Sequence, residues 1–315
     1  MAGRAEDMSV SAIIPTYNCA RLLPQAIESA IHQSHKLQEI IVVDDGSTDN
    51  TEECIRPFLS QIRYVKQENR GLAGARNRGI RESTAEFVAF LDADDVWLFE
   101  KTEKQLAAFR SSPDVVLTFT DAHVLSSSGK AMPTFMFGKG AREGYVFDGL
   151  LRSSFILPST AMIRRNCFED VGLFDEGLLC VEDLDLWLRI SRKYQVKMVA
   201  EPLAVWRRQE DSLTTKITNM GYGCIQVYRK WLSKSCGLNS EETRIVKHQI
   251  SKCYFDIGFA LREQNKTLAL KSLFLSLGWN SGNFKTWRAV LTTLLPTSLR
   301  ERLKAFGARR NGLRG

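Results

Sequence analysis

Three short polar segments carry most of the candidate chemistry in this 315-residue chain. Each segment directly follows an apolar run, and the three are Pro15-Thr16-Tyr17-Asn18, Asp44-Asp45-Gly46-Ser47 and Asp92-Ala93-Asp94-Asp95. In an open α/β sheet, the loops that follow parallel strands gather at one edge, and ligands bind there. If the apolar runs are neighbouring parallel strands, the three segments form one cleft that contains five carboxylates.

Five carboxylates in one cleft repel one another and raise one another's pKa unless a positive charge lies among them. A divalent cation is the simplest such charge, because Mg²⁺ and Mn²⁺ prefer oxygen ligands and accept phosphate oxygens. One residue separates Asp92 from Asp94, so on an extended segment their side chains point to the same face, while the side chain of Asp95 points to the other. We therefore predict that Asp92 and Asp94 bind Mn²⁺ or Mg²⁺. The alternative is that these acids only cap a helix that begins near Trp97, and capping is expected to account for one of them.

The elements that must position these segments follow from the apolar patterning. Short runs that are apolar on both faces predict buried strands at Val10–Ile14, Ile40–Val43, Phe87–Leu91 and Val115–Phe119. Helical spacing is found at Leu22–Ile31, after the N-cap candidates Ser47–Asp49, at Leu72–Gly79 and at Trp97–Phe109. This alternation predicts an α/β fold with a mainly parallel sheet and helices on both faces.

The second half of the chain is less regular at first and then helical. Residues 122–150 contain five glycines and predict a loop-rich excursion near the site. Val181–Tyr194 is predicted to be a buried helix, and Val196–Val199 and Ala204–Trp206 are predicted to be late strands. From about Gly221 onward the apolar spacing indicates helices.

Several blocks occur in an order that is recognisable as a whole. They are SAIIPTYN at 11–18, IIVVDDGSTD at 40–49, NRGLAGARNRG at 69–79, FLDADD at 90–95, GLFDE at 172–176 and EDLDLWL at 182–188. Over roughly residues 9–213 the chain closely resembles glycosyltransferase family 2, the inverting nucleotide-sugar transferases with the GT-A fold. Ordered blocks with this spacing are far more specific than any one of them, since D-x-D alone is a weak motif.

The resemblance implies a donor site in the first half of the chain. Pro15, Tyr17 and Asp45 match positions that hold the nucleotide base, usually uracil, with Asp44 beside them. Tyr17 would stack on the base, while a carboxylate would accept an N–H of the base. The alternative is a packed tyrosine followed by a turn-forming Asp-Gly.

Two further blocks are implied to contact the sugar nucleotide. Arg76 and Asn77 match a helix that borders the donor, where Arg76 would bind phosphate, although a solvated helix arginine is the alternative. Asp92, Ala93 and Asp94 resemble the family's D-x-D, which binds the ribose and the metal that bridges the diphosphate. The metal would neutralise charge on the leaving nucleoside diphosphate.

The acceptor side is implied by Glu182 and Asp183, which resemble the family's acidic pair. Inverting transfer is a single displacement, so one carboxylate must take the proton of the attacking hydroxyl. The resemblance makes Asp183 this base, with Glu182 as its neighbour. The alternative is a helix N-terminus that favours acids through its dipole, and both can hold together.

One departure from the family pattern lies at the end of the resemblance. The family often has an aromatic-Arg-x-His-x-x-Ser sequence there, whereas this chain keeps Arg207 and Ser212 but has Gln209 in place of the histidine. A histidine contribution to the metal or phosphates is therefore not expected. Arg207 or Arg208 would supply the positive charge instead.

We expect a disordered N-terminus at 1–8, a GT-A catalytic domain at 9–215 and, from its apolar spacing, a helical C-terminal region with a basic tail at 216–315. Within the catalytic domain, 9–121 would bind the nucleotide sugar and 122–215 the acceptor. Residues 281–315 contain eight basic residues and one acidic residue, which accounts for the whole net charge of +7. Basicity therefore belongs to a tail, and nucleic acid is not an expected partner.

The tail also contains apolar residues at helical spacing, so it predicts either peripheral contact with an anionic membrane surface or a helix packed on the catalytic domain. The polar N-terminus predicts no signal peptide, and scattered cysteines favour a reducing compartment. We expect a cytoplasmic protein, peripheral on the cytoplasmic membrane face if the tail binds there.

These expectations combine into one leading hypothesis: a metal-dependent inverting glycosyltransferase that uses a nucleotide-diphosphate sugar, most simply a UDP-sugar. The acceptor would be a saccharide or lipid-linked hydroxyl in polysaccharide, lipopolysaccharide or glycolipid synthesis. A sugar-phosphate nucleotidyltransferase is an alternative, although the Gly-rich triphosphate loop of such enzymes is absent from the sequence. A non-catalytic protein that binds sugar nucleotides or acts as a scaffold is the third possibility.

Overall fold

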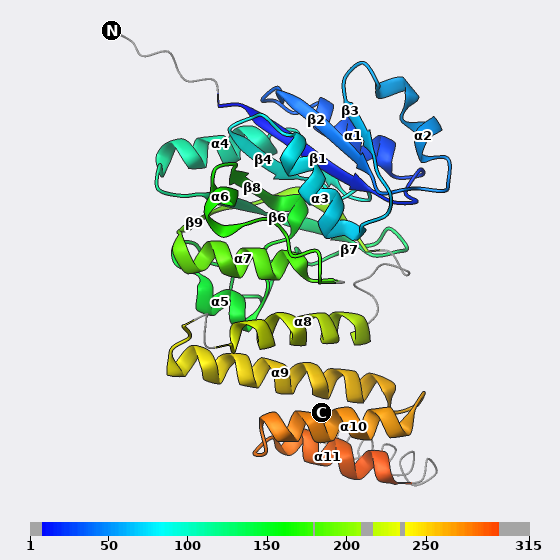
Figure 1. The fold of residues 1–315 in the computed structure, drawn as a ribbon, viewed down its shortest axis with the longest axis vertical. Coiled ribbons are helices and arrows are strands. Elements are labelled where there is room, and N and C mark those ends of the chain that lie inside the picture. Colours follow the sequence, from blue (N-terminus) through cyan, green and yellow to red (C-terminus); the bar gives the residue numbers. More distant parts are fainter. Residues whose placement is uncertain (1–7, 179, 209–216, 234–236, 296–315) are drawn as a thin grey trace, which may run out of the picture. The chain divides into compact units, whose positions relative to one another are not determined.

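The computed structural model describes residues 8–178, 180–208, 217–233 and 237–295. The chain forms two compact units, Met1–Ser212 and Leu213–Gly315 (Figure 1). The described part of the first unit combines a sheet with helices, and that of the second consists of helices and their connections.

The sheet of the first unit is mixed. Within the described residues its strands are β1 (Val10–Thr16), β2 (Glu39–Asp44), β3 (Arg63–Lys66), β4 (Phe87–Phe90), β5 (Val96–Trp97), β6 (Leu117–Leu125), β7 (Ala131–Met132), β8 (Ala161–Arg164) and β9 (Val196–Arg207). Their order is β3-β2-β1-β4-β8-β6-β9-β5, with β7 paired to β6. The first four strands in this order are parallel, and β6 pairs in parallel with β9. The remaining pairs, β4–β8, β6–β8, β6–β7 and β5–β9, are antiparallel.

Helices cover both faces of the parallel half, as the sequence predicted. The described helices of this unit are α1 (Leu23–Ile31), α2 (Thr51–Cys54), α3 (Gly71–Glu82), α4 (Lys101–Ser111), α5 (Phe147–Arg152), α6 (Cys167–Val171) and α7 (Glu182–Lys193), with 3-10 turns η1 (Arg56–Phe58) and η2 (Pro158–Thr160). Because side chains alternate along a strand, Ile14 of β1 packs with α1 while the adjacent Ile13 meets α3.

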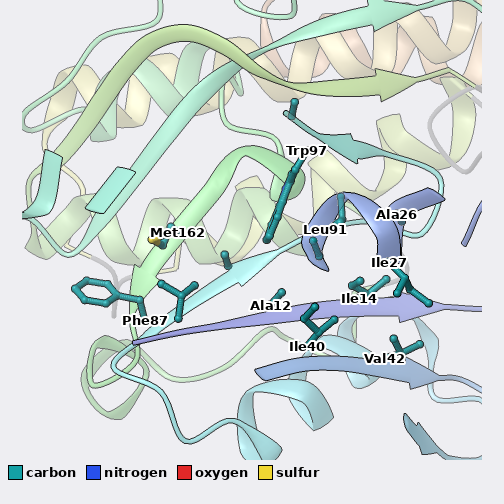
Figure 2. Packing of buried hydrophobic residues seen from close by; sticks show 14 of the residues in the cluster. Ala12, Ile14, Ala26, Ile27, Ile40, Val42, Phe87, Leu91, Trp97 and Met162 are labelled. Carbon is teal, nitrogen blue, oxygen red and sulfur yellow. The ribbon is translucent and has the colours of Figure 1, made fainter. Parts of the chain in front are cut away.

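The main core lies between the sheet and helices α1 and α4. Figure 2 shows Ala12 and Ile14 of β1 beside Ile40 and Val42 of β2, with Ile27 of α1 above them. These side chains are at most 5% exposed. Burial of such branched side chains contributes about 1.5–3 kcal/mol each, so this core holds the loop-bearing ends of β1, β2 and β4 in fixed positions.

Helix α3 lies very close to the sheet on the opposite face. A Cβ added at Gly79 would clash with the side chain of Ile13 on β1. Only glycine therefore allows α3 to approach the sheet this closely, and the buried Arg76 lies one turn earlier on the same helix.

Two predicted helix starts are wrong. Trp97 belongs to the short strand β5, and α4 begins at Lys101 with Glu100 as its N-cap residue. None of the acids at 92–95 therefore caps this helix, which removes the capping alternative for Asp92 and Asp94. Similarly, the N-cap of α2 is Asn50, one residue after the predicted candidates.

The segment at 122–150 is more ordered than predicted. Strand β6 continues to Leu125, β7 occupies Ala131–Met132 and α5 begins at Phe147. Residues 133–146 contain neither a helix nor a strand, although Gly144 forms an isolated bridge with Val196. The prediction holds for this central stretch alone.

The second unit has four described helices, α8 (Ile217–Trp231), α9 (Ser240–Leu261), α10 (Lys266–Trp279) and α11 (Phe284–Leu294). Helix α9 starts with a capping box, in which Asn239 and Glu242 each accept the backbone N–H of the other at 2.8 Å. Helices α10 and α11 share a small core. No helix in the described residues combines the length and apolar character needed to cross a bilayer.

Candidate active site

The loops that follow β1 and β2 are joined by hydrogen bonds. Asn18 has a left-handed backbone (φ 51°), and its N–H donates to Ser47 Oγ at 2.9 Å. Its side-chain oxygen Oδ1 accepts from the backbone N–H of Thr48 at 2.8 Å. Because β1, β2 and β4 are parallel neighbours, the loop after β4 lies at the same edge. The predicted gathering of the three loops is confirmed.

A hollow of about 490 Å³ opens between these loops. It is lined by Asn18, Cys19, Ala20, Arg21, Leu22, Asp49, Asn50 and Asp94. Its volume falls within the range of about 300–1,000 Å³ that is usual for small-molecule sites. Asp94 of the D-x-D segment therefore shares one cavity with residues of both other loops.

Asp44 and Asp45 are buried at the end of β2 and are held by different partners. Asp44 accepts from Tyr64 Oη at 2.5 Å and from the backbone N–H of Ser47 at 2.8 Å. Burial and the bond to Asp44 raise the pKa of Tyr64. Both oxygens of Asp44 are thus committed, and this residue fixes the turn at Gly46, which has a φ of 80°.

Asp45 differs from Asp44 because the hydrogen bonds it accepts from described residues all reach the same oxygen, Oδ1. Asp45 Oδ1 accepts from Gln67 Nε2 and from the backbone N–H of Arg70, each at 2.8 Å. Within the described residues no hydrogen bond reaches its second oxygen. Asp45 therefore keeps one free acceptor at the strand end.

Pro15 and Tyr17 lie on either side of the last residue of β1. Pro15 is buried within the strand, opposite Val43 of β2. Tyr17 is 52% exposed, so the alternative of a packed tyrosine is wrong. About half of its surface is therefore accessible to a ligand.

The three acids after β4 have separate environments. Asp95 is buried, accepting from Ser159 Oγ at 2.5 Å and from the backbone N–H of Arg207 at 3.1 Å. Burial and the nearby Asp94 and Asp92 raise the pKa of Asp95 well above its ordinary value. Asp95 therefore anchors the loop to η2 and β9, away from Asp92 and Asp94, as the sequence predicted.

Asp94 lines the hollow, and the pKa of its carboxyl group is raised. Burial and the neighbouring Asp92 raise the pKa of Asp94 to about 6, against the opposing effects of Arg207 and Arg76. No hydrogen bond from another described side chain reaches its carboxylate. Asp94 is thus a half-buried acid that forms no ion pair with a described side chain.

Arg76 connects Asp92 of the D-x-D segment with Glu182 at the start of α7. Its side chain is 1% exposed, with Nη2 2.6 Å from Asp92 Oδ1 and Nη1 2.5 Å from Glu182 Oε1. Burial alone would lower the pKa of Arg76, but the larger combined effect of the two carboxylates raises this pKa above its ordinary value. The guanidinium therefore stays charged. The alternative of a solvated helix arginine is wrong. The guanidinium is positioned by α3 and covered by the ring of Phe174, 5.4 Å away.

Asn77 is also buried, and its contacts are with protein. It donates to the carbonyl of Phe174 and to Glu176 Oε1, both at 2.9 Å, and accepts from the backbone N–H of Phe174 at 2.9 Å. These bonds fix the segment at 172–176 against α3. Asn77 thereby holds Phe174 over Arg76, which is a different contact from the donor contact that the resemblance implied.

Glu182 and Asp183 form the first turn of α7, after an unusual N-cap. Val181 has a left-handed backbone (φ 56°), which is strained for a β-branched residue. Glu182 is buried against Arg76, and Asp183 is partly buried with its Oδ1 accepting from the backbone N–H of Leu184. Burial and the neighbouring Glu182 raise the pKa of Asp183 to about 7. This value suits a carboxylate that exchanges a proton near neutral pH.

Arg207 ends β9 beside the D-x-D segment. Its Nη2 donates to Gln25 Oε1 at 2.7 Å, while its buried Nη1 has no hydrogen-bond partner among the described residues. It lowers the pKa of Asp94, which indicates proximity. Arg208 instead lies near the ring of Trp206. Gln209 and Ser212 lie outside the described residues.

Three residues contribute to the site although no role was predicted for them; Phe174 lies in the recognised block at 172–176, and Ser159 and Lys139 lie outside every recognised block. Ser159 binds both Asp95 and the backbone N–H of Asp92, and Phe174 covers Arg76. Lys139 lies with Nζ 3.2 Å from the ring centre of Phe135 and donates to a backbone carbonyl. Burial lowers the pKa of Lys139 to about 8, against the opposing effects of Asp183 and Asp121. This cation therefore lies near Asp183 and Asp121.

The carboxylates of the D-x-D segment are the candidate ligands for a divalent cation. No group of three or more His, Cys, Asp or Glu residues in the described part of the chain could hold a metal ion. Asp94 nevertheless lines the hollow, and Asp92, two residues earlier, has one oxygen paired with Arg76. Mg²⁺ commonly binds through one or two carboxylates plus water and phosphate oxygens. The residues fit a metal whose remaining ligands come from the substrate.

Comparison with known proteins identifies the family of this chain and supports its fold. The sequence profile described as "Glycosyl transferase family 2" matches residues 11–172, more than half of the chain. The chain belongs to glycosyltransferase family 2. The matched residues of this family 2 chain include the three loops, Arg76 and η2, and end before α7.

Relatives of this family 2 protein differ in length. An uncharacterized glycosyltransferase of Rickettsia bellii (strain RML369-C) is 33% identical over 211 residues, which are 66% of this chain and 30% of that protein. This chain thus spans less than a third of that relative. The Escherichia coli protein named UDP-Glc:alpha-D-GlcNAc-diphosphoundecaprenol beta-1,3-glucosyltransferase WfgD is 27% identical over 197 residues, 62% of this chain and 74% of that protein.

A solved structure extends the comparison to the fold. The crystal structure of S. aureus TarS 1-349 in complex with UDP-GlcNAc matches with a TM-score of 0.61 at 17% identity, covering 95% of this chain and 92% of that chain. The fold is therefore GT-A, with a helical C-terminal region, as the sequence predicted.

Proposed function

We propose that this family 2 protein is a metal-dependent inverting glycosyltransferase that moves a sugar from a UDP-sugar to a hydroxyl acceptor. The observation that carries the proposal is the buried guanidinium of Arg76, which binds Asp92 and Glu182 together. One cation thus links the D-x-D segment to the acidic pair that includes Asp183. Single-displacement transfer needs these two groups of carboxylates beside the same bond.

The nucleotide would be held by the loops after β1 and β2. Tyr17 has an exposed ring on which a base can stack, and Pro15 fixes the backbone before it. Asp45 has one oxygen left to accept an N–H of the base, whereas Asp44 holds the loop. The relatives support uracil as the base, because the names of WfgD and of the TarS complex contain UDP-Glc and UDP-GlcNAc.

The diphosphate would lie between Asp94 and Arg207. Asp92 and Asp94 would hold Mn²⁺ or Mg²⁺, and the bound cation would supply positive charge to the departing diphosphate. The unpartnered Nη1 of Arg207 is a donor suited to a phosphate oxygen. Arg76 would act indirectly, since both of its arms bind carboxylates, and it would keep Asp92 oriented toward the diphosphate.

Asp183 would be the base of the transfer. Its carboxylate takes the proton of the acceptor hydroxyl while that oxygen bonds to the anomeric carbon. The bond from this carbon to the diphosphate breaks on the opposite side, so its configuration inverts. A pKa of about 7 leaves a useful fraction of Asp183 ionised at neutral pH. Glu182 would keep Asp183 in position through its pairing with Arg76.

We further propose a saccharide or lipid-linked acceptor from cell-envelope polysaccharide, lipopolysaccharide or glycolipid synthesis. WfgD supports this class, because its name specifies a sugar carried on diphosphoundecaprenol. Such an acceptor lies at a membrane. Accordingly, we propose that the protein acts in the cytoplasm at the membrane face, where the basic composition of 281–315 favours contact with anionic lipid.

The proposal is tested by a thermal-shift screen of UDP-, GDP- and dTDP-sugars with and without Mn²⁺. A UDP-sugar with Mn²⁺ should give the largest rise in melting temperature, since a ligand at 100 times its Kd adds about 2.7 kcal/mol to the unfolding free energy. A larger rise with a GDP- or dTDP-sugar would correct the base. Absence of stabilisation by any sugar nucleotide would contradict donor binding. NMR of the product from the best donor then tests for inversion.

A further inference from the structure

Helix α11 has two apolar faces, of which one is buried. Ala289 and Val290 of α11 pack with Leu273 and Leu277 of α10, and all four are at most 6% exposed. Thr286 and Thr293 on the same face are also buried. This face accounts for the attachment of α11 to its neighbour.

The second apolar face of α11 is exposed. Its members, called the α11 stripe, are Phe284, Trp287, Leu291 and Leu294, which are 78%, 45%, 63% and 52% exposed. They follow one another at steps of three, four and three residues, so on an α-helix they lie within an arc of about 80°. A helix that packs on one side is normally polar on the other. Four large apolar side chains in one exposed row therefore indicate a partner.

The charges around the α11 stripe identify the chemistry of that partner. Lys285 and Arg288 on α11 are both exposed, and the helix contains no acidic residue. The sequence that follows, 296–315, adds six basic residues and one acidic residue. A second copy of the chain would bring two surfaces of like charge together, which is unfavourable. An anionic lipid surface is complementary to both the charge and the apolar row.

We propose that the α11 stripe binds an anionic lipid bilayer. The helix would lie in the plane of the interface with the stripe inserted among the acyl chains, while Lys285 and Arg288 contact lipid phosphates. This inference rests on the membrane placement proposed above and names the surface that makes the contact. Vesicle binding is measured without donor or acceptor, so its failure is distinguishable from a failure of the proposed transfer reaction.

The test is co-sedimentation of the full chain with vesicles of phosphatidylcholine alone or with 30% phosphatidylglycerol. The protein should bind the anionic vesicles at least about tenfold more strongly, since each basic residue near the surface contributes a factor of about five. Phe284→Ser with Leu291→Ser should reduce binding at least about tenfold, because exposed apolar area is removed from the inserted row. Arg288→Gln should weaken binding to the anionic vesicles about fivefold.

Phe99→Ser is the matched control. Phe99 is 65% exposed, close to the 63% of Leu291, but it lies in the first unit. Its replacement should leave vesicle binding unchanged. Equal losses for both sets of variants, or equal binding to neutral and anionic vesicles, would overturn the proposal. A self-associating chain that Leu291→Ser converts to monomers, with no vesicle binding, would assign the stripe to a second copy and also overturn it.

A second measurement avoids any loss of folding. Brominated lipids should quench the fluorescence of Trp287 in the full chain, and this quenching should disappear in Trp287→Phe, which keeps an apolar ring. Trp287 Nε1 bonds the carbonyl of Ser281 at 2.9 Å, so the indole has a fixed position at the start of the stripe. Unchanged quenching in Trp287→Phe would show that the stripe stays in water.

Discussion

Arg76 Nη1 lies 2.5 Å from Glu182 Oε1, although the two residues are 106 positions apart in the chain. The second arm of the same guanidinium binds Asp92. The middle of α3 is thereby joined to the first residue of α7 by one buried cation. The orientation of Asp92 and that of the α7 N-terminus consequently depend on a single side chain.

Replacement of Arg76 by alanine should lower the free energy of unfolding by about 3–5 kcal/mol, because Glu182 and Asp92 lose their shared buried partner. Urea denaturation measures this loss. The control is Arg78→Ala on the same helix, whose ion pair with Glu82 is 45% exposed on the arginine side. That change should cost less than about 1 kcal/mol. Equal losses would mean that the Arg76 pairs contribute no more than a surface ion pair.

The Asp183→Asn change should lower kcat by about 10²–10⁴-fold, the usual contribution of a general base. Donor affinity should stay within about twofold, because Asp183 is proposed to contact the acceptor. Stopped turnover assays give kcat, and calorimetric titration with the donor gives Kd. A variant with normal turnover would exclude Asp183 as the base.

The pH dependence should report the raised pKa of Asp183. Its carboxylate form is the active one, so kcat/KM should rise as pH increases through about 7 and should be about tenfold lower at pH 6 than at pH 8. Lys139→Met removes a nearby cation, so the midpoint should move to higher pH. The exposed Lys130 in Lys130→Met serves as the control and should leave the midpoint in place. A flat profile from pH 5.5 to 8 would rule out titration of this base.

Asp94→Ala should weaken donor binding at least about tenfold in Mn²⁺, a loss of about 1.4 kcal/mol. The reason is the removal of one of two carboxylates proposed to hold the metal against the diphosphate. Calorimetry with and without EDTA measures the effect. With EDTA, wild type and variant should bind the donor within about threefold of each other. A tenfold difference that persists without metal would instead indicate a direct contact.

Val181→Gly should raise the free energy of unfolding by about 1 kcal/mol, because glycine adopts the left-handed backbone without strain. Val181→Ala keeps a Cβ and should give a smaller gain or none. Activity should fall several-fold in Val181→Gly, since the added backbone freedom loosens the turn that carries Asp183. Thermal melts and turnover assays check the two effects separately. A destabilised glycine variant would mean that the Val181 side-chain contacts outweigh the backbone cost.

The gathering of acids at one sheet edge could be predicted from sequence, because its basis is local. Asp44 and Asp92 each end an apolar run, and parallel strands bring such ends together. The helix that begins near Asp183 was also predictable from its apolar spacing. Periodicity within a segment fixed these elements without knowledge of their neighbours.

The pairings between distant segments could not be predicted in the same way. Strand β8 has a run of only three apolar residues, so nothing in its sequence predicts that it lies antiparallel to β4. Arg76 gave no sign of burial, because a basic residue in a helix is usually solvated. Its burial depends on Asp92 and Glu182 arriving from elsewhere in the chain. The role of Ser159 could not be predicted either, because its partners Asp92 and Asp95 lie in a distant segment of the chain.

Gly79 has a consequence that reaches well beyond its own position. Because Gly79 has no side chain, α3 packs closely on Ile13 of β1. Arg76 lies on the same helix, so its position depends on this packing distance. Even a methyl group there would lift the helix and withdraw the guanidinium from both acids at once. The two ion pairs of Arg76 therefore depend on the absence of a side chain at Gly79, on the face of the sheet opposite the main core.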